Sequence, residues 1–166
     1  MSWAKKNAKP LGDDITAINK AALALLGRRE YSQKELRAKL TERGADKEVL
    51  DAALSRLVEV GYLDDSRYAA AFVRDRRDFH PCGAALIRRD LAAKGVSAEL
   101  IDIAIEEEYD PERERETLRD LVAKAMAAAP GDEQGRDKYL QRLIRRYLGK
   151  GFPQNMVIEE LQDIRR

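Results

Sequence analysis

The chain has very few of the side chains on which most metal sites and many catalytic sites are built. Its 166 residues include one cysteine, Cys82, and one histidine, His80. Together they are too few for a usual zinc site, and a single cysteine excludes an intramolecular disulfide. We therefore expect structural or loop roles for both residues, and we expect no metal and no cofactor. The lack of a disulfide framework suits a reducing compartment, which predicts a cytoplasmic location.

Other signatures of function are also missing from the sequence. No apolar run approaches the roughly 20 residues of a membrane helix, so we expect no membrane contact. There is no glycine-rich phosphate loop, no nucleophile elbow and no histidine-bearing metal motif. Carboxylates are plentiful, but they lie in stretches of mixed charge. These absences predict a protein that is not an enzyme and has no catalytic residues.

The composition is typical of a helical protein. Apolar residues make up 44 % of the chain, charged residues 37 % and aromatic residues only 6 %. Alanine, leucine, glutamate, lysine and arginine dominate, as they do in helix-rich chains. The formal net charge is only +1. A nucleic-acid surface would therefore require basic residues to be sorted to particular helices.

Three glycines, Gly44, Gly95 and Gly151, mark an internal repeat of roughly 50 residues. Eight positions before each glycine stands an apolar residue, and four positions before it stands a large residue. A cationic residue directly precedes each glycine. A residue suited to opening a helix follows two positions after it. Glycine can adopt the left-handed conformation that ends a helix, so each copy predicts a helix, a tight turn and a second helix.

The repeat predicts an all-α fold, namely an elongated, curved array of three tandem three-helix repeats with helix-turn-helix-like pairs. Each unit is too small to bury much surface alone, so stacking should supply part of its stability. We expect a flexible basic tail over residues 1–12, followed by repeats over 13–61, 62–109 and 110–166. The third repeat contains the Pro130–Gly135 stretch, which we expect to be a loop.

Local signals predict where several helices begin. Asp13 or Asp14 can cap the first helix, and Asp46 can cap the third. Ser32 with Glu35 is typical of a capping box, in which each side chain accepts a hydrogen bond from the backbone of the other.

The stretch from Tyr62 to Arg74 connects the first repeat to the second. Asp64 and Asp65 are suited to opening a helix there. Tyr68, Ala69, Phe72 and Val73 then recur at helical spacing and predict one apolar face.

The same stretch carries a resemblance to a known family. Leu63-Asp64-Asp65-x-Arg67-Tyr68-Ala69-x-x-Phe72-Val73 resembles the signature of the RecX family, small bacterial regulators of the RecA recombinase. Ile87-x-x-x-Leu91-x-x-Lys94-Gly95 is similar to that family's second marker. The resemblance covers roughly Ala21 to Arg166. It implies a protein that binds RecA–DNA filaments along their groove and restrains ATP hydrolysis, strand exchange and co-protease activity in recombination and SOS repair.

Charge is sorted along the chain. Basic residues outnumber acidic ones on the middle helix of every repeat, whereas acids dominate residues 99–116. Stacked repeats could align the basic helices into a stripe that neutralises phosphates, although solvated helix faces would give the same pattern. Tyr139 is a candidate for stacking on bases, and Tyr147 falls at a core position. The predicted nucleic-acid or filament contacts are Arg37, Arg43, Arg67, Arg74, Arg76, Arg77, Arg88, Arg89, Lys94, Arg142, Arg145, Arg146 and Lys150.

The acidic run contains Glu106, Glu107, Glu108, Glu112, Glu114 and Glu116. It could face a basic patch on a protein partner or simply keep the protein soluble.

Three functions fit these patterns. The first is a RecX-like monomer whose partners are the RecA filament and single-stranded DNA, with duplex DNA as a further candidate. The second is a helix-turn-helix regulator that reads duplex DNA, although the helices after Gly44 and Gly95 are acidic or mixed rather than basic. The third is a repeat scaffold that binds only protein.

Overall fold

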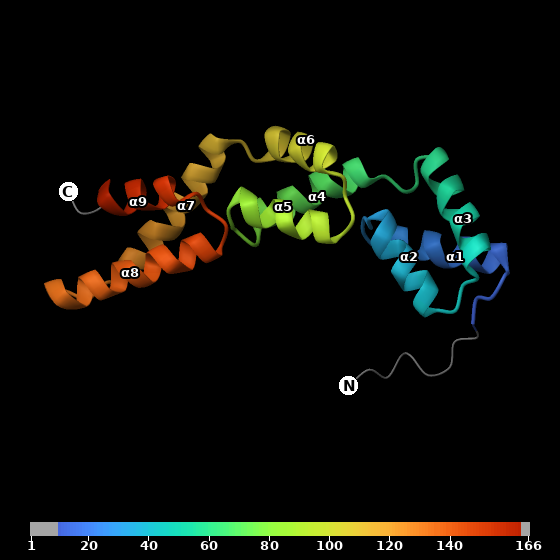
Figure 1. Ribbon diagram of the computed structural model, residues 1–166, viewed down its shortest axis with the longest axis horizontal. Helices are drawn as coiled ribbons and strands as arrows, with labels where there is room; N and C mark the ends of the chain where they lie inside the picture. The colour runs from blue at the N-terminus through green and yellow to red at the C-terminus, as the bar shows by residue number, and fades with distance from the viewer. Residues whose placement is uncertain (1–9, 164–166) are drawn as a thin grey trace. The chain divides into compact units, whose positions relative to one another are not determined.

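The computed structural model describes residues 10–163, and within that range the chain is helical (Figure 1). The predicted all-α fold is therefore confirmed. One isolated parallel bridge, between Gly12 and Ala45, is the only strand-like pairing in the described residues. The helices are α1 (Ile15–Leu26), α2 (Gln33–Glu42), α3 (Lys47–Glu59), α4 (Asp65–Asp78), α5 (Ala84–Ala93), α6 (Ala98–Glu108), α7 (Pro111–Met126), α8 (Glu133–Gly149) and α9 (Gln154–Asp163).

The chain divides into two compact units. Of the described residues, one unit comprises 10–68 with Lys94–Val96, and the other comprises Ala69–Ala93 with 97–163. The helices fall three by three within the expected ranges 13–61, 62–109 and 110–166. The division into three repeats with those boundaries stays a prediction. Among residues 10–163, no helix is both long enough and apolar enough to span a bilayer.

Each unit has its own apolar core. In the first unit α1, α2 and α3 pack against one another, and Ile18, Leu36 and Leu50 are almost completely buried between them. In the second unit α7 and α8 each pack against α9, where Leu118 and Val157 have no exposed surface. These residues recur at helical spacing, so each helix buries one face and leaves its charged face in solvent.

Helices begin where short polar side chains meet free backbone N–H groups. Asp14 Oδ1 accepts hydrogen bonds from Thr16 N (2.9 Å) and Ala17 N (3.0 Å). Asp64 Oδ1 accepts from Ser66 N at 2.8 Å. Both contacts confirm the predicted caps and place a negative charge at the positive end of a helix.

The Ser32–Glu35 capping box is only half formed. Ser32 Oγ accepts a hydrogen bond from Glu35 N at 3.1 Å, as expected. The Glu35 carboxylate instead binds Lys94 and Arg29, at 2.6 and 3.4 Å. The predicted reciprocal bond was wrong, because two cations compete for that carboxylate.

The loop predicted over residues 130–135 is displaced. Helix α7 ends at Met126 and α8 already begins at Glu133. Asp132 caps α8 by accepting a hydrogen bond from Gly135 N at 2.7 Å. This cap allows the weak helix former Gly135 to lie in the first helical turn.

Each repeat glycine adopts the left-handed conformation that the sequence predicted. The φ angles of Gly44, Gly95 and Gly151 are 75°, 84° and 87°. The carbonyl of the cationic residue before each glycine is covered by a donor from an earlier segment. These bonds are Leu11 N to Arg43 O (3.0 Å), Ser32 Oγ to Lys94 O (2.7 Å) and Gly83 N to Lys150 O (2.9 Å).

Residues 10–12 lie against the first of these turns. Leu11 is buried, Gly12 N donates to Gly44 O at 2.9 Å, and Asp46 N donates to Gly12 O at 2.7 Å. These residues, which the sequence placed in a loose tail, are thus part of the first unit. Residues 1–9 of the expected tail lie outside the described residues.

The turn geometry predicts a large cost for Gly151→Ala. A Cβ atom there would lie 2.5 Å from Leu86 N, and φ is in the region that side chains rarely adopt. We expect the free energy of unfolding to fall by about 2–4 kcal/mol, measured by urea denaturation.

Gly149→Ala is the matched control. Gly149 is the last residue of α8, and a Cβ atom there would meet nothing within 4 Å. This variant should be unchanged or more stable by about 0.4–1 kcal/mol. Equal losses in the two variants would contradict the assigned role of the turn.

Candidate nucleic-acid interface

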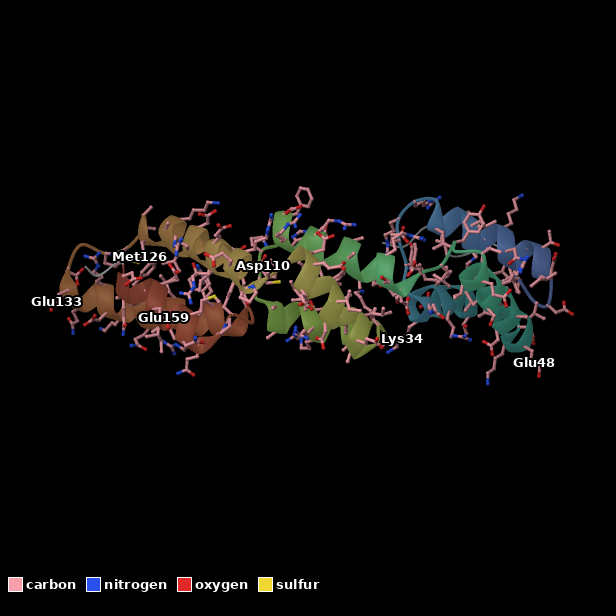
Figure 2. The ribbon with its side chains drawn as sticks, turned by 90° about the horizontal axis from the view of Figure 1, so that it is seen from above. Lys34, Glu48, Asp110, Met126, Glu133 and Glu159 are labelled. Carbon is pink, nitrogen blue, oxygen red and sulfur yellow. The ribbon has the colours of Figure 1, made fainter. Side chains whose placement is uncertain are left out.

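Helix α8 carries five exposed cations. Its buried face is formed by Leu140, Leu143 and Tyr147, which pack into the core of the second unit. Figure 2 labels Glu133, the first residue of this helix. The exposed side chains that we call the α8 basic face are Arg136, Lys138, Arg142, Arg145 and Arg146.

Within residues 10–163, no member of the α8 basic face forms an ion pair. The Arg142 guanidinium lies 5.4 Å from the centre of the Tyr139 ring, and Arg145 Nε donates to the Gln141 carbonyl at 3.3 Å. Neither contact neutralises charge. The positive charge of this face therefore remains available to phosphates.

An arginine in the middle helix of each of the first two repeats is neutralised by an aspartate. Arg37 on α2 binds Asp51 on α3, and Arg88 on α5 binds Asp102 on α6. The two pairs occupy equivalent positions when the repeats are aligned on their glycines. Exposed pairs contribute little stability, but they cancel much of the local field that would attract a phosphate.

The arginines near the end of α4 also face carboxylates. Arg74 and Arg77 both contact Glu108 at the end of α6, and Arg77 Nε additionally binds Asp78 at 2.6 Å. The hydrogen bond that Arg77 donates to Asp78 raises the pKa of Arg77.

Arg76 and Arg89 share a single carboxylate, that of Asp90, at 3.3 and 3.1 Å. The Arg76 guanidinium also lies 4.9 Å from the centre of the Phe72 ring. These contacts stabilise the packing of α4 and α5 within the second unit and reduce the charge available to a ligand.

The lysines before two turn glycines form specific internal contacts. Lys94 Nζ binds Glu35 Oε1 at 2.6 Å, and Lys150 Nζ donates to the Pro81 carbonyl at 3.1 Å. Burial tends to raise the pKa of Glu35, but the hydrogen bond and charge of Lys94 hold it below its ordinary value. Both lysines therefore hold a turn against an earlier segment.

Arg67 of the signature stretch also has a structural role. Its Nε binds Glu30 Oε1 at 2.6 Å, while Nη1 and Nη2 donate to the carbonyls of Gly61 and Tyr62, each at 3.1 Å. The hydrogen bond that Arg67 donates to Glu30 raises the pKa of Arg67.

Among the predicted contacts, the exposed cations without an ion pair to a described residue are Arg43, Arg142, Arg145 and Arg146. Arg43 lies at the first turn of the first unit, whereas the other three share α8. Arg136 and Lys138 belong to the same helix but were missing from the predicted contacts. The excess of basic residues in the sequence of this helix could have identified them.

Both tyrosines of α8 have rings that are at least half-buried and hydroxyl groups that donate to backbone carbonyls of α7. Tyr147 is buried, as its position in the repeat predicted, and its hydroxyl donates to Leu121 O at 2.8 Å. Tyr139 is half-buried and donates to Ala125 O at 2.7 Å. Both rings anchor α8 to α7, so stacking on bases has little support at these positions.

Parts of the acidic run serve the interior of the second unit. Glu108 binds the α4 arginines, and Glu114 is buried, with Oε1 accepting a hydrogen bond from Ala84 N at 2.7 Å. Burial raises the pKa of Glu114. Glu114 therefore caps α5 from α7, which the sequence did not reveal because the two residues lie far apart in the chain.

Cys82 and His80 lie in the loop between α4 and α5, as expected. Cys82 is buried and its carbonyl accepts a hydrogen bond from the Tyr109 hydroxyl at 3.0 Å, whereas His80 is exposed. The described part of the chain contains no cluster of three metal-ligating side chains.

Comparisons with known proteins agree with the repeat structure. Residues 20–57 match the family profile described as RecX, first three-helix domain, and residues 64–105 match RecX, second three-helix domain. Regulatory protein RecX from Streptomyces coelicolor is 33 % identical over 153 residues, covering 92 % of this chain and 80 % of that protein. Regulatory protein RecX from Pseudomonas putida is 36 % identical over 146 residues, covering 87 % and 89 %.

A solved structure supports the fold. The crystal structure of RecX from Lactobacillus salivarius matches with a TM-score of 0.79 over 91 % of this chain and 96 % of that chain. Sequence identity in that comparison is 22 %. A second crystal structure of regulatory protein RecX also gives a TM-score of 0.79, with 24 % identity over 90 % of this chain and 73 % of that chain.

The structural role of Lys94 predicts that Lys94→Met destabilises the protein. We expect a loss of about 1–2 kcal/mol at neutral pH, because a charged hydrogen bond to a partly buried carboxylate is removed. The lowered pKa of Glu35 means that the bond stabilises the fold above the carboxyl's unfolded pKa and is lost as the pH falls through its folded pKa.

Urea unfolding of wild type and Lys94→Met from neutral to acidic pH measures this effect. The difference between them should shrink as the pH falls. Lys39→Met, at an exposed position near the end of α2, is the control and should change stability by less than about 0.5 kcal/mol. A difference that stays constant with pH would rule out the Glu35 contact as its source.

Proposed function

Since the chain belongs to the RecX family, we propose that it binds RecA filaments formed on single-stranded DNA and restrains their ATPase, strand-exchange and co-protease activities in recombination and SOS repair. In this proposal it acts as a cytoplasmic monomer that performs no reaction of its own. Control comes from occupancy of the filament, since binding can change the filament's activity without any chemistry in the bound protein.

The observation that carries the proposal is the α8 basic face. Its cations are exposed and, within residues 10–163, have no carboxylate partners. Each phosphate that they neutralise would release a counterion, which gives affinity without base specificity. A regulator of a filament benefits from such sequence-independent contact, because the filament forms on any DNA sequence.

The other predicted cations support a smaller role in DNA contact. Arg37 and Arg88 would have to exchange a carboxylate for a phosphate, and Lys94 would have to leave Glu35. We therefore assign the main nucleic-acid contact to the third repeat. Arg43 is retained as a second, isolated candidate.

Direct reading of duplex DNA is the second candidate function. Helix α9 follows the third turn and begins with the exposed residues Gln154 and Asn155, whose amide groups suit base edges. Against it, α3 and α6 follow the other turns and use Asp51 and Asp102 to bind arginines of the preceding helices. Of the three turns, the third is thus the one followed by a helix that begins with amide side chains suited to reading base edges.

The proposal predicts that replacing Arg142, Arg145 and Arg146 with glutamine weakens filament binding about tenfold or more at low salt. The salt dependence of the binding constant should also fall, by about 0.7 in logarithmic slope for each lost single-strand phosphate contact. Fluorescence anisotropy with labelled RecA–DNA filaments at several salt concentrations measures both quantities.

The control replaces Arg37, Arg88 and Arg89 with glutamine, which removes the same formal charge from ion-paired positions. This variant should keep most of the wild-type affinity and slope, with helicity checked by circular dichroism. Equal losses in both variants would contradict the assignment to α8. Sequence-dependent duplex binding that exceeds filament binding would favour the second candidate.

A further inference from the structure

The first unit has a hollow beside the signature stretch. Its volume is about 370 Å³. One wall comes from the end of α1, with Leu23, Leu26 and Gly27, and the other comes from the connection between α3 and α4, with Gly61 and Tyr62. Arg67 and Glu30 complete the lining.

Arg67 fixes the shape of this hollow. Its three guanidinium nitrogen atoms donate hydrogen bonds to the Glu30 carboxylate and to the carbonyls of Gly61 and Tyr62. These bonds fix the backbone of the wall that carries Tyr62. The Arg67–Glu30 ion pair also neutralises the only two charged residues of the lining. The hollow therefore has no free cation with which to bind a phosphate.

Two apolar side chains of the lining are open to solvent. Leu23 is 42 % exposed and Tyr62 is 58 % exposed. Exposed apolar side chains that adjoin one another at a concave surface are typical of interaction sites. Two further exposed apolar residues, Val58 and Val60, lie at the end of α3 and just beyond it.

The apolar wall residues of the hollow are not repeated at the aligned positions of the second repeat. When these are aligned on Gly44 and Gly95, Leu23 corresponds to Arg74 and Leu26 to Arg77. Both arginines bind Glu108 instead of lining an apolar surface. The repeat fold therefore does not require apolar residues at these positions.

Charge beside the hollow indicates the character of its ligand. Arg28 directly follows the wall residue Gly27, is exposed, and forms no ion pair with any described residue. An occupant that complements this site would place an uncharged side chain in the hollow and a carboxylate next to Arg28. Apolar anchors that fill a pocket beside such a charge pair are typical of protein–protein hot spots.

We propose that this hollow binds a large apolar side chain of the recombinase protein, flanked by an acidic residue that contacts Arg28. The inference rests on the proposed function and adds a site for protein to it, separate in role from the α8 basic face that contacts DNA. Tyr62 supplies the main contact surface, and Arg67 is a positioning residue that orients it.

The test compares Tyr62→Ala, Arg28→Glu and the control Phe79→Ala. Phe79 is the most exposed large apolar residue of the described chain, at 75 %, and it lies outside the hollow. Affinity is measured for RecA filaments on single-stranded DNA and, separately, for the bare single strand. We expect Tyr62→Ala and Arg28→Glu to weaken filament binding about tenfold. Binding to the bare strand should not change in Tyr62→Ala, and Phe79→Ala should match wild type in both assays.

Several outcomes would overturn this inference. If Tyr62→Ala binds filaments as wild type does, the hollow is not a contact site, although the proposed function stands. An equal loss on the bare strand would mean that Tyr62 stacks on a nucleobase. A wild-type protein that fails to bind filaments would overturn the proposed function as well.

Discussion

The fold depends on a left-handed glycine turn whose preceding carbonyl is always covered. At Gly44, Gly95 and Gly151 the chain reverses between two helices. A donor from an earlier segment then binds the carbonyl that the reversal exposes, so each turn is also a point of attachment. Residues 10–12 cover the first turn, whereas Ser32, directly before α2, and Gly83, directly before α5, cover the later ones. The same turn therefore reverses the chain locally and ties it to an earlier segment.

This constraint also divides the basic residues into two groups. Some cations are held by the fold, as Lys94 is by Glu35 and Arg67 is by Glu30. Arg37 and Arg88, in the middle helices of the first two repeats, are balanced by aspartates of the helices that follow the turn. In the third repeat both aligned positions are isoleucines, Ile144 and Ile158, so no such pair forms there. Two carboxylates of α9, those of Glu159 and Glu160, instead bind Arg115 and Arg119 of α7, so they do not compensate the charge of α8.

Sequence reasoning succeeded where the cause is local. The Asp14 cap, the φ angles of the glycines and the burial of Tyr147 each depend on a few neighbouring residues, and all were predicted. The partners of Arg67, Lys94 and Glu114 were not, because they lie about 30 or more positions away along the chain. A count of charges along a helix does not reveal which of them face a carboxylate after folding. For the same reason, the hollow beside Tyr62 had no sequence signal.

The account's central claim is that α8 meets the nucleoprotein filament while the paired arginines remain within the protein's own contacts. Arginine-specific chemical labelling, quantified residue by residue by mass spectrometry, tests this claim directly when free and filament-bound protein are compared. The account predicts that Arg142, Arg145 and Arg146 lose reactivity in the complex, while Arg37 and Arg88 react equally in both states. Protection of Arg37 and Arg88 with undiminished labelling of α8 would contradict it.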